Sequence, residues 1–349
     1  MQPVAPRIAF QSHNRRGLGH LMRGLNIARA IRERAPAADI LFYTRNASAA
    51  ELCGREFRYV VAPDTTGPAD WAAQLARFAP DAIVYDTLLP NEHDAAPVTR
   101  AAYIMRKCKP ERQLQIFAST FVGQVALVLI PHTPDEFGYS LPSTLAHKSY
   151  FVGPIVRQPG PAAQAAVCRR YGISPADFVL VSTPGGGGFA DDAAAFFATV
   201  RQVHQRLAAL RPNLRHLVIK GPHFQQPLAA PPGMTVVAYE PELVSLFARA
   251  DLVIAEGGYN TVNELRVAQA PAIFLPGERS YDDQAERVRG LQRRGLAAVF
   301  EQRGRAAAAI AALAANDAWL GAARARYAGD QITLGNRAAA EHILALAVA

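Results

Sequence analysis

The sequence predicts an α/β protein built from two doubly wound, Rossmann-like parallel-sheet domains that face each other across a cleft. The first observation is that short apolar runs alternate with helical patterns, as they do in parallel sheets. The second is a break in this alternation at residues 152–164, VGPIVRQPGPAAQ, where three prolines and two glycines are typical of an interdomain linker. The third is the length of 349 residues, which is long for a single hydrophobic core.

The first half begins with a strand at 7–12, which is followed by a glycine loop and a helix over residues 20–34. Further strands are predicted at 40–43, 59–62, 82–86, 115–118 and 126–130, with a helix at 69–79. The alternation indicates that these strands form one parallel sheet.

The pattern restarts after the linker. Strands are predicted at 178–182, 216–220, 235–238, 252–255 and 272–275, and helices at 191–210 and 241–249. The alanine-rich segment 305–349 is predicted to be helical, and its apolar end is expected to pack against the protein. The predicted domains are therefore 1–157 and 158–330, with a C-terminal helix at 331–349 that packs back on the first domain.

Charge and composition narrow the function classes. The chain carries a formal charge of +8, but its arginines are dispersed and no aromatic-basic recognition pattern accompanies them. Nucleic-acid binding is therefore not expected, whereas peripheral contact with an anionic membrane surface stays open. No apolar run approaches the roughly 18 to 20 residues that span a bilayer, and the first residues lack a signal-peptide core. We expect a cytoplasmic protein.

The cysteine and histidine spacings argue against metal and disulfide chemistry. Cys53, Cys108 and Cys168 are far apart and fit neither a disulfide framework nor a zinc site. The neighbouring pair His93 and Asp94 lacks a third ligand at a suitable spacing. No metal site is expected.

The stretch from 250 to 287 carries the most specific pattern. The apolar run 252–255 meets Gly257 and Gly258, and a polar helix start follows at Asn260 and Thr261. Glycines permit positive φ and close backbone approach. A helix N-terminus, which Asn260 or Thr261 can cap, carries unpaired N–H groups and partial positive charge, so it suits a phosphate.

Glu264 lies one turn further along this predicted helix. Its spacing from Thr261 fits a capping box, but an acidic group here can equally accept hydrogen bonds from a ribose diol. The spacing leaves both interpretations open. A polar loop with Asp282, Asp283 and Gln284 follows the next strand.

A second glycine motif, PGGGG at 184–188, lies between a predicted strand and a predicted helix. Four consecutive glycines lose much backbone entropy on folding, so a merely structural turn rarely needs all of them. A backbone nest for a diphosphate explains the run, and a flexible hinge is the alternative.

The first glycine loop, HNRRGLGHLMRGL at 13–25, lacks the spacing of a dinucleotide fingerprint and the lysine of an NTPase loop. Its Gly17/Gly19 turn presents His20 at a helix start, where partial positive charge disfavours the protonated imidazole. His20 is therefore the first candidate base, His13 is the second, and a packing or capping role is the alternative.

Two further residues are candidates near this loop. Asp86 ends a buried strand, where it can orient a catalytic histidine or cap the following turn. Arg23 either contacts an anion or braces the loop. His132 also ends a predicted strand, and its role is open.

At these residues the chain resembles the MurG-like, two-domain GT-B glycosyltransferases, whose second domain is of the glycosyltransferase family 28 C-terminal type. The resemblance is strongest over 236–298, where ADLVIAEGGYNTVNEL, PAIFLP, DDQAERV and GLA follow in family order. It extends to PGGGG and to GLGHLMR, so it covers motifs in both predicted domains.

The resemblance implies a metal-independent, inverting glycosyltransferase that moves a sugar from a nucleotide-diphosphate donor, most simply a UDP-sugar, to an acceptor hydroxyl. It needs no cofactor. The implied catalytic residues are His20, His13 and Asp86, in an acceptor-side first domain. The implied donor-binding residues are Gly19, Gly185, Gly186, Gly187, Gly188, Tyr239, Glu240, Gly257, Gly258, Tyr259, Asn260, Thr261, Glu264, Asp283 and Gln284. Among these, the resemblance assigns Glu264 to the ribose.

The expected partners are a nucleotide sugar and an acceptor that the sequence does not identify. One alternative is a nucleotide-sugar hydrolase of the same fold, which also carries a Gly-His-x-x-Arg loop. A sugar epimerase of this architecture is a further alternative. A different class is a non-catalytic nucleotide-sugar-binding protein that supports another enzyme. Turnover of the donor, with or without an acceptor, distinguishes these alternatives.

Overall fold

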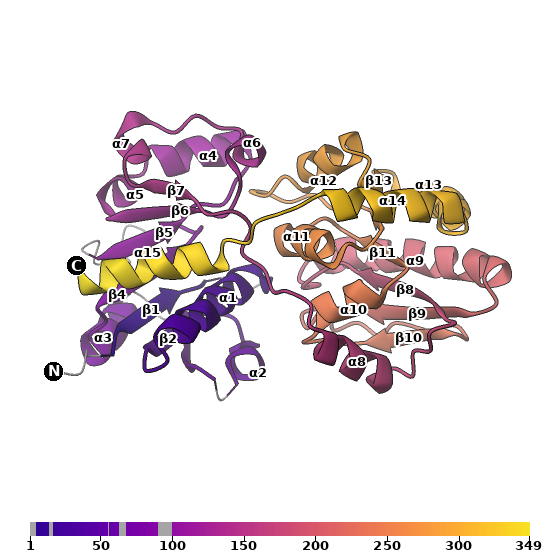
Figure 1. Cartoon of the computed structure of the whole chain (residues 1–349), viewed down its shortest axis with the longest axis horizontal. Coiled ribbons are helices and arrows are strands. Elements are labelled where there is room, and N and C mark those ends of the chain that lie inside the picture. The colour runs from indigo at the N-terminus through magenta and orange to yellow at the C-terminus, as the bar shows by residue number, and fades with distance from the viewer. Residues whose placement is uncertain (1–4, 14–16, 55, 63–67, 90–99) are drawn as a thin grey trace. The chain divides into compact units, whose positions relative to one another are not determined.

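The computed structural model describes residues 5–13, 17–54, 56–62, 68–89 and 100–349 (Figure 1). The chain divides into two compact units. Unit 1 comprises residues 1–156 and 333–349, and unit 2 comprises residues 157–332. The predicted His93/Asp94 pair lies outside the described residues.

Unit 1 contains a seven-stranded parallel sheet in the order β3-β2-β1-β4-β5-β6-β7. Its strands are β1 (Arg7–Gln11), β2 (Asp39–Thr44), β3 (Arg58–Val61), β4 (Ala82–Asp86), β5 (Ala101–Ile104), β6 (Leu127–Ile130) and β7 (Ser149–Phe151). The central strands are apolar and buried along their length, as expected where helices cover both faces of a parallel sheet.

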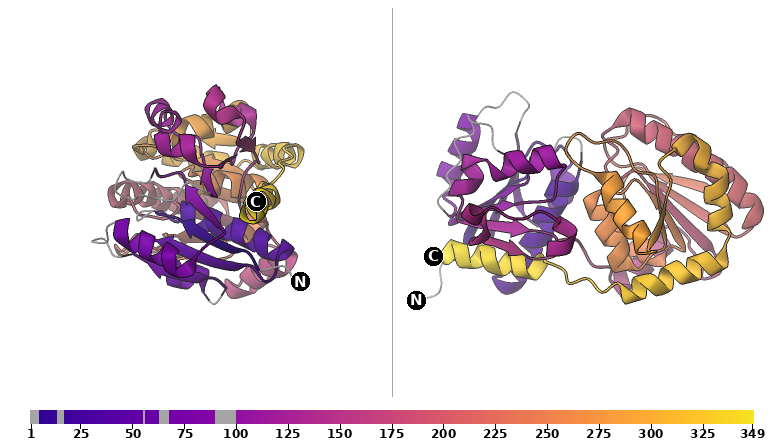
Figure 2. Two further views of the ribbon diagram at one scale, coloured as in Figure 1. Left: turned by 90° about the vertical axis from the view of Figure 1, so that its left-hand side faces the viewer. Right: turned by 90° about the horizontal axis from the view of Figure 1, so that it is seen from above.

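The helices of unit 1 lie on both faces of this sheet (Figure 2). They are α1 (Gly19–Arg34), α2 (Ala49–Cys53), α3 (Pro68–Phe78), α4 (Pro110–Phe117), α5 (Thr120–Gln124), α6 (Pro134–Phe137), α7 (Ser143–Ala146) and α15 (Asn336–Val348). Helix α15 buries Ala339, Ala340 and Ile343 in the same core as Leu21 and Leu25 of α1. The last helix of the chain therefore completes the core of unit 1.

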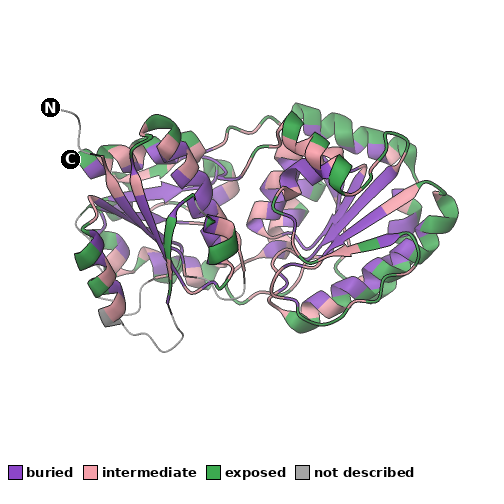
Figure 3. Ribbon diagram, turned by 90° about the horizontal axis from the view of Figure 1, so that it is seen from below, coloured by how far each residue is buried: buried purple, intermediate pink, exposed green. Residues whose placement is uncertain are grey.

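Unit 2 contains a six-stranded parallel sheet in the order β10-β9-β8-β11-β12-β13. Its strands are β8 (Phe178–Thr183), β9 (Leu214–Ile219), β10 (Met234–Val237), β11 (Leu252–Ala255), β12 (Ala272–Phe274) and β13 (Ala297–Val299). Its helices are α8 (Pro161–Arg170), α9 (Ala190–Leu210), α10 (Leu243–Arg249), α11 (Tyr259–Ala268), α12 (Gln284–Arg293), α13 (Arg303–Ala314) and α14 (Asp317–Gly329). The central strands of each sheet are buried while the outer helix faces are exposed (Figure 3).

The predicted fold class, two doubly wound parallel sheets, is confirmed. Two local predictions are wrong. Residues 115–117 belong to α4 and Ala118 is its C-cap; this helix starts with Pro110 at its first turn and buries Gln113 and Ile116 at helical spacing. The linker is shorter than predicted, because α8 already begins at Pro161. The helical prediction for the C-terminal segment is confirmed by α13, α14 and α15.

The cysteines and the apolar helices can be located within the described residues. Cys53, Cys108 and Cys168 are free thiols. Within the described ranges no single helix has the length and apolar composition of a membrane span. Helices α13 and α14 have that length and composition only when taken together, and the pair is bent by 86°. Ile310 and Ala311 of α13 are buried in the core of unit 2.

Candidate functional site

In unit 1, His20 and Asp86 meet at the carboxyl-end edge of the sheet. His20 is the second residue of α1, and Asp86 is the last residue of β4. The His20 Nδ1 atom lies 3.1 Å from the main-chain oxygen of Asp86 and 3.2 Å from its Oδ1. Both side chains are largely buried. Of the two roles predicted for Asp86, this geometry fits the orientation of a histidine.

Arg23, one turn further along α1, holds the same carboxylate from the other side. Its Nε donates to Asp86 Oδ2 at 3.0 Å, and a terminal nitrogen donates to Oδ1 at 2.6 Å. The Thr87 hydroxyl also donates to Oδ1, at 2.7 Å. Burial raises the pKa of Asp86, but the charges of Arg23 and His20 and their hydrogen bonds outweigh it, so the net shift is downward. Arg23 therefore braces the loop.

The other two histidines predicted near this edge have structural contacts. The ring of His13, after β1, lies 5.1 Å from the ring of Tyr43. His132, after β6, accepts a hydrogen bond at Nε2 from the main-chain nitrogen of Lys107 at 3.0 Å. Gly19, predicted to help bind the donor, is the first residue of α1.

In unit 2, the PGGGG loop joins β8 to α9 and is folded tightly rather than open. Gly185 and Gly187 have positive φ, and a Cβ atom on Gly187 would lie 2.6 Å from the carbonyl oxygen of Lys220. The main-chain nitrogen of His223 donates to the oxygen of Gly186 at 3.1 Å. These contacts favour a fixed backbone nest over the hinge alternative, with Gly188 at its end next to α9.

The second glycine turn joins β11 to α11. Gly257 has a φ of 101°, and a Cβ there would approach Val288 to 2.5 Å. Gly258 is the N-cap of α11, and no described side chain caps the helix. Asn260 and Thr261 lie inside its first turn, so the prediction that one of them is the cap is wrong. The start of α11 carries the partial positive charge of the helix dipole, which favours an anion.

Glu264 is the sixth residue of α11, because the helix starts at Tyr259. This position excludes the capping box, which requires the third helical residue. No hydrogen bond or ion pair joins the carboxylate of Glu264 to any residue that the structure describes. Burial raises its pKa to about 7, and the charge of Arg157 opposes that rise. An acceptor without a partner among the described residues, on the helix that follows the second glycine turn, suits a ligand hydroxyl.

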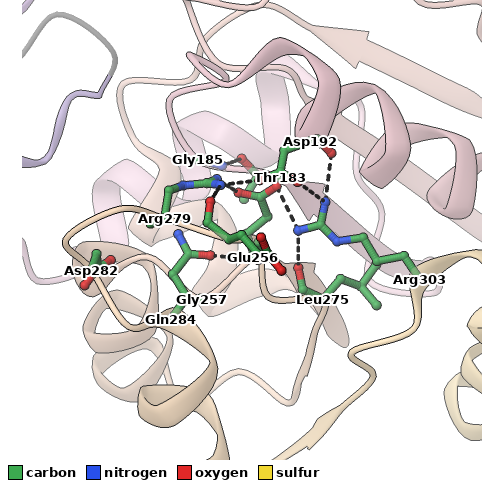
Figure 4. Close-up of polar contacts among 12 residues, drawn as sticks. Thr183, Gly185, Asp192, Glu256, Gly257, Leu275, Arg279, Asp282, Gln284 and Arg303 are labelled. Atoms are coloured by element: carbon green, nitrogen blue, oxygen red, sulfur yellow. Dashed lines mark hydrogen bonds and ion pairs between the residues drawn. The ribbon is translucent and has the colours of Figure 1, made fainter. Parts of the chain in front are cut away.

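A charged network that the sequence analysis missed lies under the two glycine turns (Figure 4). Glu256, directly after β11, is paired with Arg279 and with Arg303, whose terminal nitrogen lies 3.1 Å from Oε1. Both arginines also pair with Asp192 in the first turn of α9. Because Asp192 is neutralised in this way, its charge opposes an anion at the start of α9 less strongly. Glu256 directly follows a buried strand. An acidic residue at the carboxyl end of a buried strand, as also at Asp86, is the sequence signal that could have identified this network.

The remaining predicted donor ligands have defined roles in the fold. The Glu240 carboxylate accepts hydrogen bonds from Arg170, Tyr171 and the main chain of Glu242, and the neighbouring Tyr239 is half-buried. Asp283 caps α12 through a bond from the Glu286 main-chain nitrogen at 2.9 Å.

The amide of Gln284 lies beside this cap. Its Oε1 accepts from the main-chain nitrogen of Gly277 at 3.1 Å, and the residue is largely buried. Asp283 and Gln284 therefore shape the loop after β12, whatever they contribute to a ligand.

Behind the PGGGG loop lies a buried chain of hydrogen-bonding side chains. Ser182 Oγ lies 2.8 Å from His216 Nε2, and His216 Nδ1 lies 3.2 Å from His204 Nδ1. His204 Nε2 lies 3.0 Å from the oxygen of Pro232. Burial lowers the pKa of His216 well below its ordinary value, and the charge of His204 adds to this effect. The described residues include no group of three or more His, Cys, Asp or Glu side chains arranged to hold a metal ion.

Residues 186–315 match the model of the glycosyltransferase family 28 C-terminal domain. The chain is 25% identical over 324 residues to a UDP-N-acetylglucosamine–N-acetylmuramyl-(pentapeptide) pyrophosphoryl-undecaprenol N-acetylglucosamine transferase of Symbiobacterium thermophilum, covering 84% of this chain and 83% of the relative. The enzyme of the same description from Chromohalobacter salexigens is 26% identical over 312 residues, with 81% of each chain covered.

Solved structures resemble the whole chain. The glycotransferase of kitacinnamycin has a TM-score of 0.63 at 16% identity, covering 99% of this chain and all of the other. Arabidopsis thaliana UGT89C1, complexed with UDP, has a TM-score of 0.63 at 12% identity, with 98% and 100% covered.

The two Rossmann-like sheets and these neighbours define the GT-B fold. With the family 28 domain in unit 2, they make the protein an enzyme, a glycosyltransferase. The chain is similar to the MurG-like glycosyltransferases, and the resemblance found in its sequence is confirmed.

Proposed function

We propose that this protein transfers a sugar from a UDP-sugar to an acceptor hydroxyl, with inversion at the anomeric carbon and without a metal ion. The observation that carries the proposal is the unpartnered carboxylate of Glu264, which follows an uncapped helix start in a family 28 domain. Relatives named as UDP-N-acetylglucosamine-dependent transferases support UDP as the nucleotide.

The diphosphate is assigned to the two glycine turns. Gly185 and Gly187 have positive φ, as glycines in anion-binding backbone nests do, and the Gly185 N–H donates to the Thr183 hydroxyl at 3.1 Å. The start of α11 carries no acidic residue in its first turn and adds partial positive charge. These dipoles stabilise the negative charge that develops on the departing diphosphate, which is the role a metal ion has in other transferases.

The nucleoside is assigned to Glu264 and to the loop before α10. The ionised Glu264 carboxylate accepts hydrogen bonds from the two ribose hydroxyls. The backbone at the half-buried Tyr239 meets the base, and the buried Glu240 carboxylate keeps that loop in place. Asp283 and Gln284 are assigned to the sugar hydroxyls.

His20 is assigned as the general base. Its Nε2 takes the proton of the acceptor hydroxyl while the acceptor oxygen forms a bond to the anomeric carbon. The bond from that carbon to the diphosphate oxygen breaks, and UDP leaves with the electron pair. Attack from the face opposite the leaving group inverts the anomeric configuration. The Asp86 carboxylate stabilises the imidazolium that forms.

Calorimetric titration with UDP, dTDP and GDP tests the donor assignment. We expect UDP to bind the wild-type chain and to bind Glu264→Gln about tenfold more weakly, since a hydrogen bond to a charged group contributes about 1.5–3 kcal/mol. Equal affinity of the two proteins for UDP would contradict the ribose assignment.

Incubation of UDP-N-acetylglucosamine with a panel of hydroxyl acceptors tests the reaction, and NMR of the product gives the anomeric configuration. Turnover that persists in EDTA and gives the inverted anomer agrees with the proposal, whereas loss of turnover in EDTA contradicts metal independence. Fast release of free sugar without an acceptor would identify a hydrolase. Binding without turnover would identify a non-catalytic partner protein.

A further inference from the structure

We propose that Arg23 is a positioning residue that fixes the Asp86 carboxylate in contact with His20 and offsets the charge of that carboxylate. The proposal rests on the proposed function, in which His20 accepts the proton of the acceptor. Arg23 lies on α1, three residues after His20, and therefore on the same face of the helix.

The geometry gives Asp86 a single orientation. Arg23 binds both carboxylate oxygens with two nitrogens, at 3.0 and 2.6 Å, and its own exposure is only 2%. Thr87 adds a third donor and is itself held with a φ of 59°, because its carbonyl accepts a bond of 2.6 Å from the Tyr103 hydroxyl. With these donors in place, Oδ1 stays within reach of His20.

This orientation determines which imidazole nitrogen carries the proton. His20 Nδ1 faces the main-chain oxygen and Oδ1 of Asp86, and both are acceptors. The carboxylate is ionised, because its pKa is lowered despite burial. Nδ1 must therefore carry hydrogen, which leaves the lone pair of Nε2 free to take a proton.

Charge explains why a guanidinium is needed as well as a hydroxyl. An isolated carboxylate beside a buried imidazole would stabilise the protonated ring, and opposite charges this close shift a pKa by about 1–3 units. The positive charge of Arg23 on the same carboxylate opposes that shift.

Further titratable groups lie on the neighbouring elements that the structure describes. From β5, Tyr103 is buried beside Asp86, and burial raises the pKa of its hydroxyl well above its ordinary value, so it stays neutral. After β1, the ring of His13 lies against Tyr43. Of the described charges that lower the pKa of Asp86, that of Arg23 acts most strongly.

The test is the dependence of kcat/KM on pH for the wild-type full chain, Arg23→Gln and Arg23→Lys, with the donor that the titrations identify. In Arg23→Gln the acid limb should move up by about 1–3 units. Activity at pH 7 should fall at least about tenfold and recover toward pH 9. Arg23→Lys keeps the positive charge but loses the two-nitrogen contact with the Asp86 carboxylate. The acid limb of this variant should therefore stay at the wild-type pH, while its kcat falls. Millimolar guanidinium should move the acid limb of Arg23→Gln back toward the wild-type value.

Arg29→Gln is the matched control, since Arg29 lies on the same helix and makes a two-nitrogen contact to Glu56 at the surface. It should leave the pH profile unchanged. An acid limb in Arg23→Gln at the wild-type pH, with activity reduced equally at all pH values, would overturn the proposal. If Arg23→Gln does not fold, a displaced acid limb in Arg23→Lys would overturn it.

Failure of the proposed function has a different signature. A His20→Ala chain that retains turnover would remove His20 as the base, whatever Arg23 does. UDP affinity, which is assigned to unit 2, should be the same in all these variants, and circular dichroism of the full chain reports that unit 1 is folded in each one.

Discussion

The two halves of the proposed active site use different kinds of chemical group. In unit 1 the reactive group is held by buried side chains, with His20, Asp86 and Arg23 in mutual contact. In unit 2 the diphosphate is proposed to meet backbone groups at two glycine turns, near which the arginine network lies. A proton acceptor needs a controlled pKa, which neighbouring charges supply, whereas a diphosphate needs several donors and positive potential. The comparison predicts that substitutions in unit 1 change turnover and that substitutions in unit 2 change donor affinity.

The largest expected effect is that of His20→Ala, which removes the general base. Turnover should fall by about 10²–10⁴-fold, while the Kd of UDP measured by calorimetry should not change. His13→Ala is the matched control at the same sheet edge, and it should alter turnover by less than about threefold, since the ring of His13 lies against Tyr43. Equal losses in the two variants would show that the base is wrongly assigned.

The next effect is that of Gly187→Ala, which tests the backbone site. The new Cβ would meet the Lys220 carbonyl oxygen at 2.6 Å in a residue with positive φ. Strain of this kind costs about 1–3 kcal/mol, so urea unfolding should show a less stable unit 2, and the Kd of UDP should rise. Gly160→Ala has open space around its Cβ and should change neither quantity. A fully stable Gly187→Ala chain would contradict the tight turn.

A smaller effect is expected at Glu264, where one substitution should increase the stability of unit 2 and decrease its affinity for UDP. Its pKa in the folded chain, about 7, lies above the ordinary value of 4.5. Between these values the folded chain keeps a proton that the unfolded chain releases, so stability falls as the pH rises through 7. Glu264→Gln should therefore stabilise unit 2 at pH 8, with little effect at pH 4, while it weakens UDP binding.

The titration of Glu264 should also appear in binding. In the wild-type chain, UDP affinity should rise from pH 6 to pH 8 as the carboxylate ionises, and the Glu264→Gln chain should lack that component. The same pH dependence in both proteins would assign the titration to another group.

The smallest effect is expected from His216 under the PGGGG loop. Its pKa is lowered in the folded chain, so the unfolded chain takes up the proton first as the pH falls. Stability contributed by the neutral ring is present above pH 6.5 and is lost below it, by about 1 kcal/mol per pH unit. Hydrogen exchange of β8 and β9 amides between pH 7.5 and 5.5 should follow this loss. An equally steep loss in His216→Gln would contradict the assignment.

The sequence predicted the donor half of the site more completely than the acceptor half. Glycine runs such as PGGGG and the pair Gly257–Gly258 are visible because the turn geometry requires the residue type itself. The fold class followed from the same local signals of strand, turn and helix. A contact between Arg23 and Asp86 joins residues 63 apart, and nothing in either local sequence requires it.

Local errors had local physical causes. The segment 115–118 has apolar residues that fit a short strand, but Pro110 starts a helix five residues earlier and tertiary burial of Ile116 completes it. Choosing between the two roles of Glu264 requires the exact start of α11. Because the helix starts at Tyr259, Glu264 lies too far along it for a capping box. Helix boundaries are the property that a sequence pattern specifies least well.

The return of α15 to unit 1 has a consequence for synthesis of the protein. The ribosome makes α15 after all of unit 2, because residues 157–332 separate it from the rest of unit 1. The apolar surface at Leu21 and Leu25, against which Ile343 packs, therefore stays uncovered while unit 2 is translated. Unit 2 is continuous in sequence. Domains usually fold during synthesis in N-terminal order. Here the nascent chain can complete its donor-binding unit first, and the unit that carries His20 closes last.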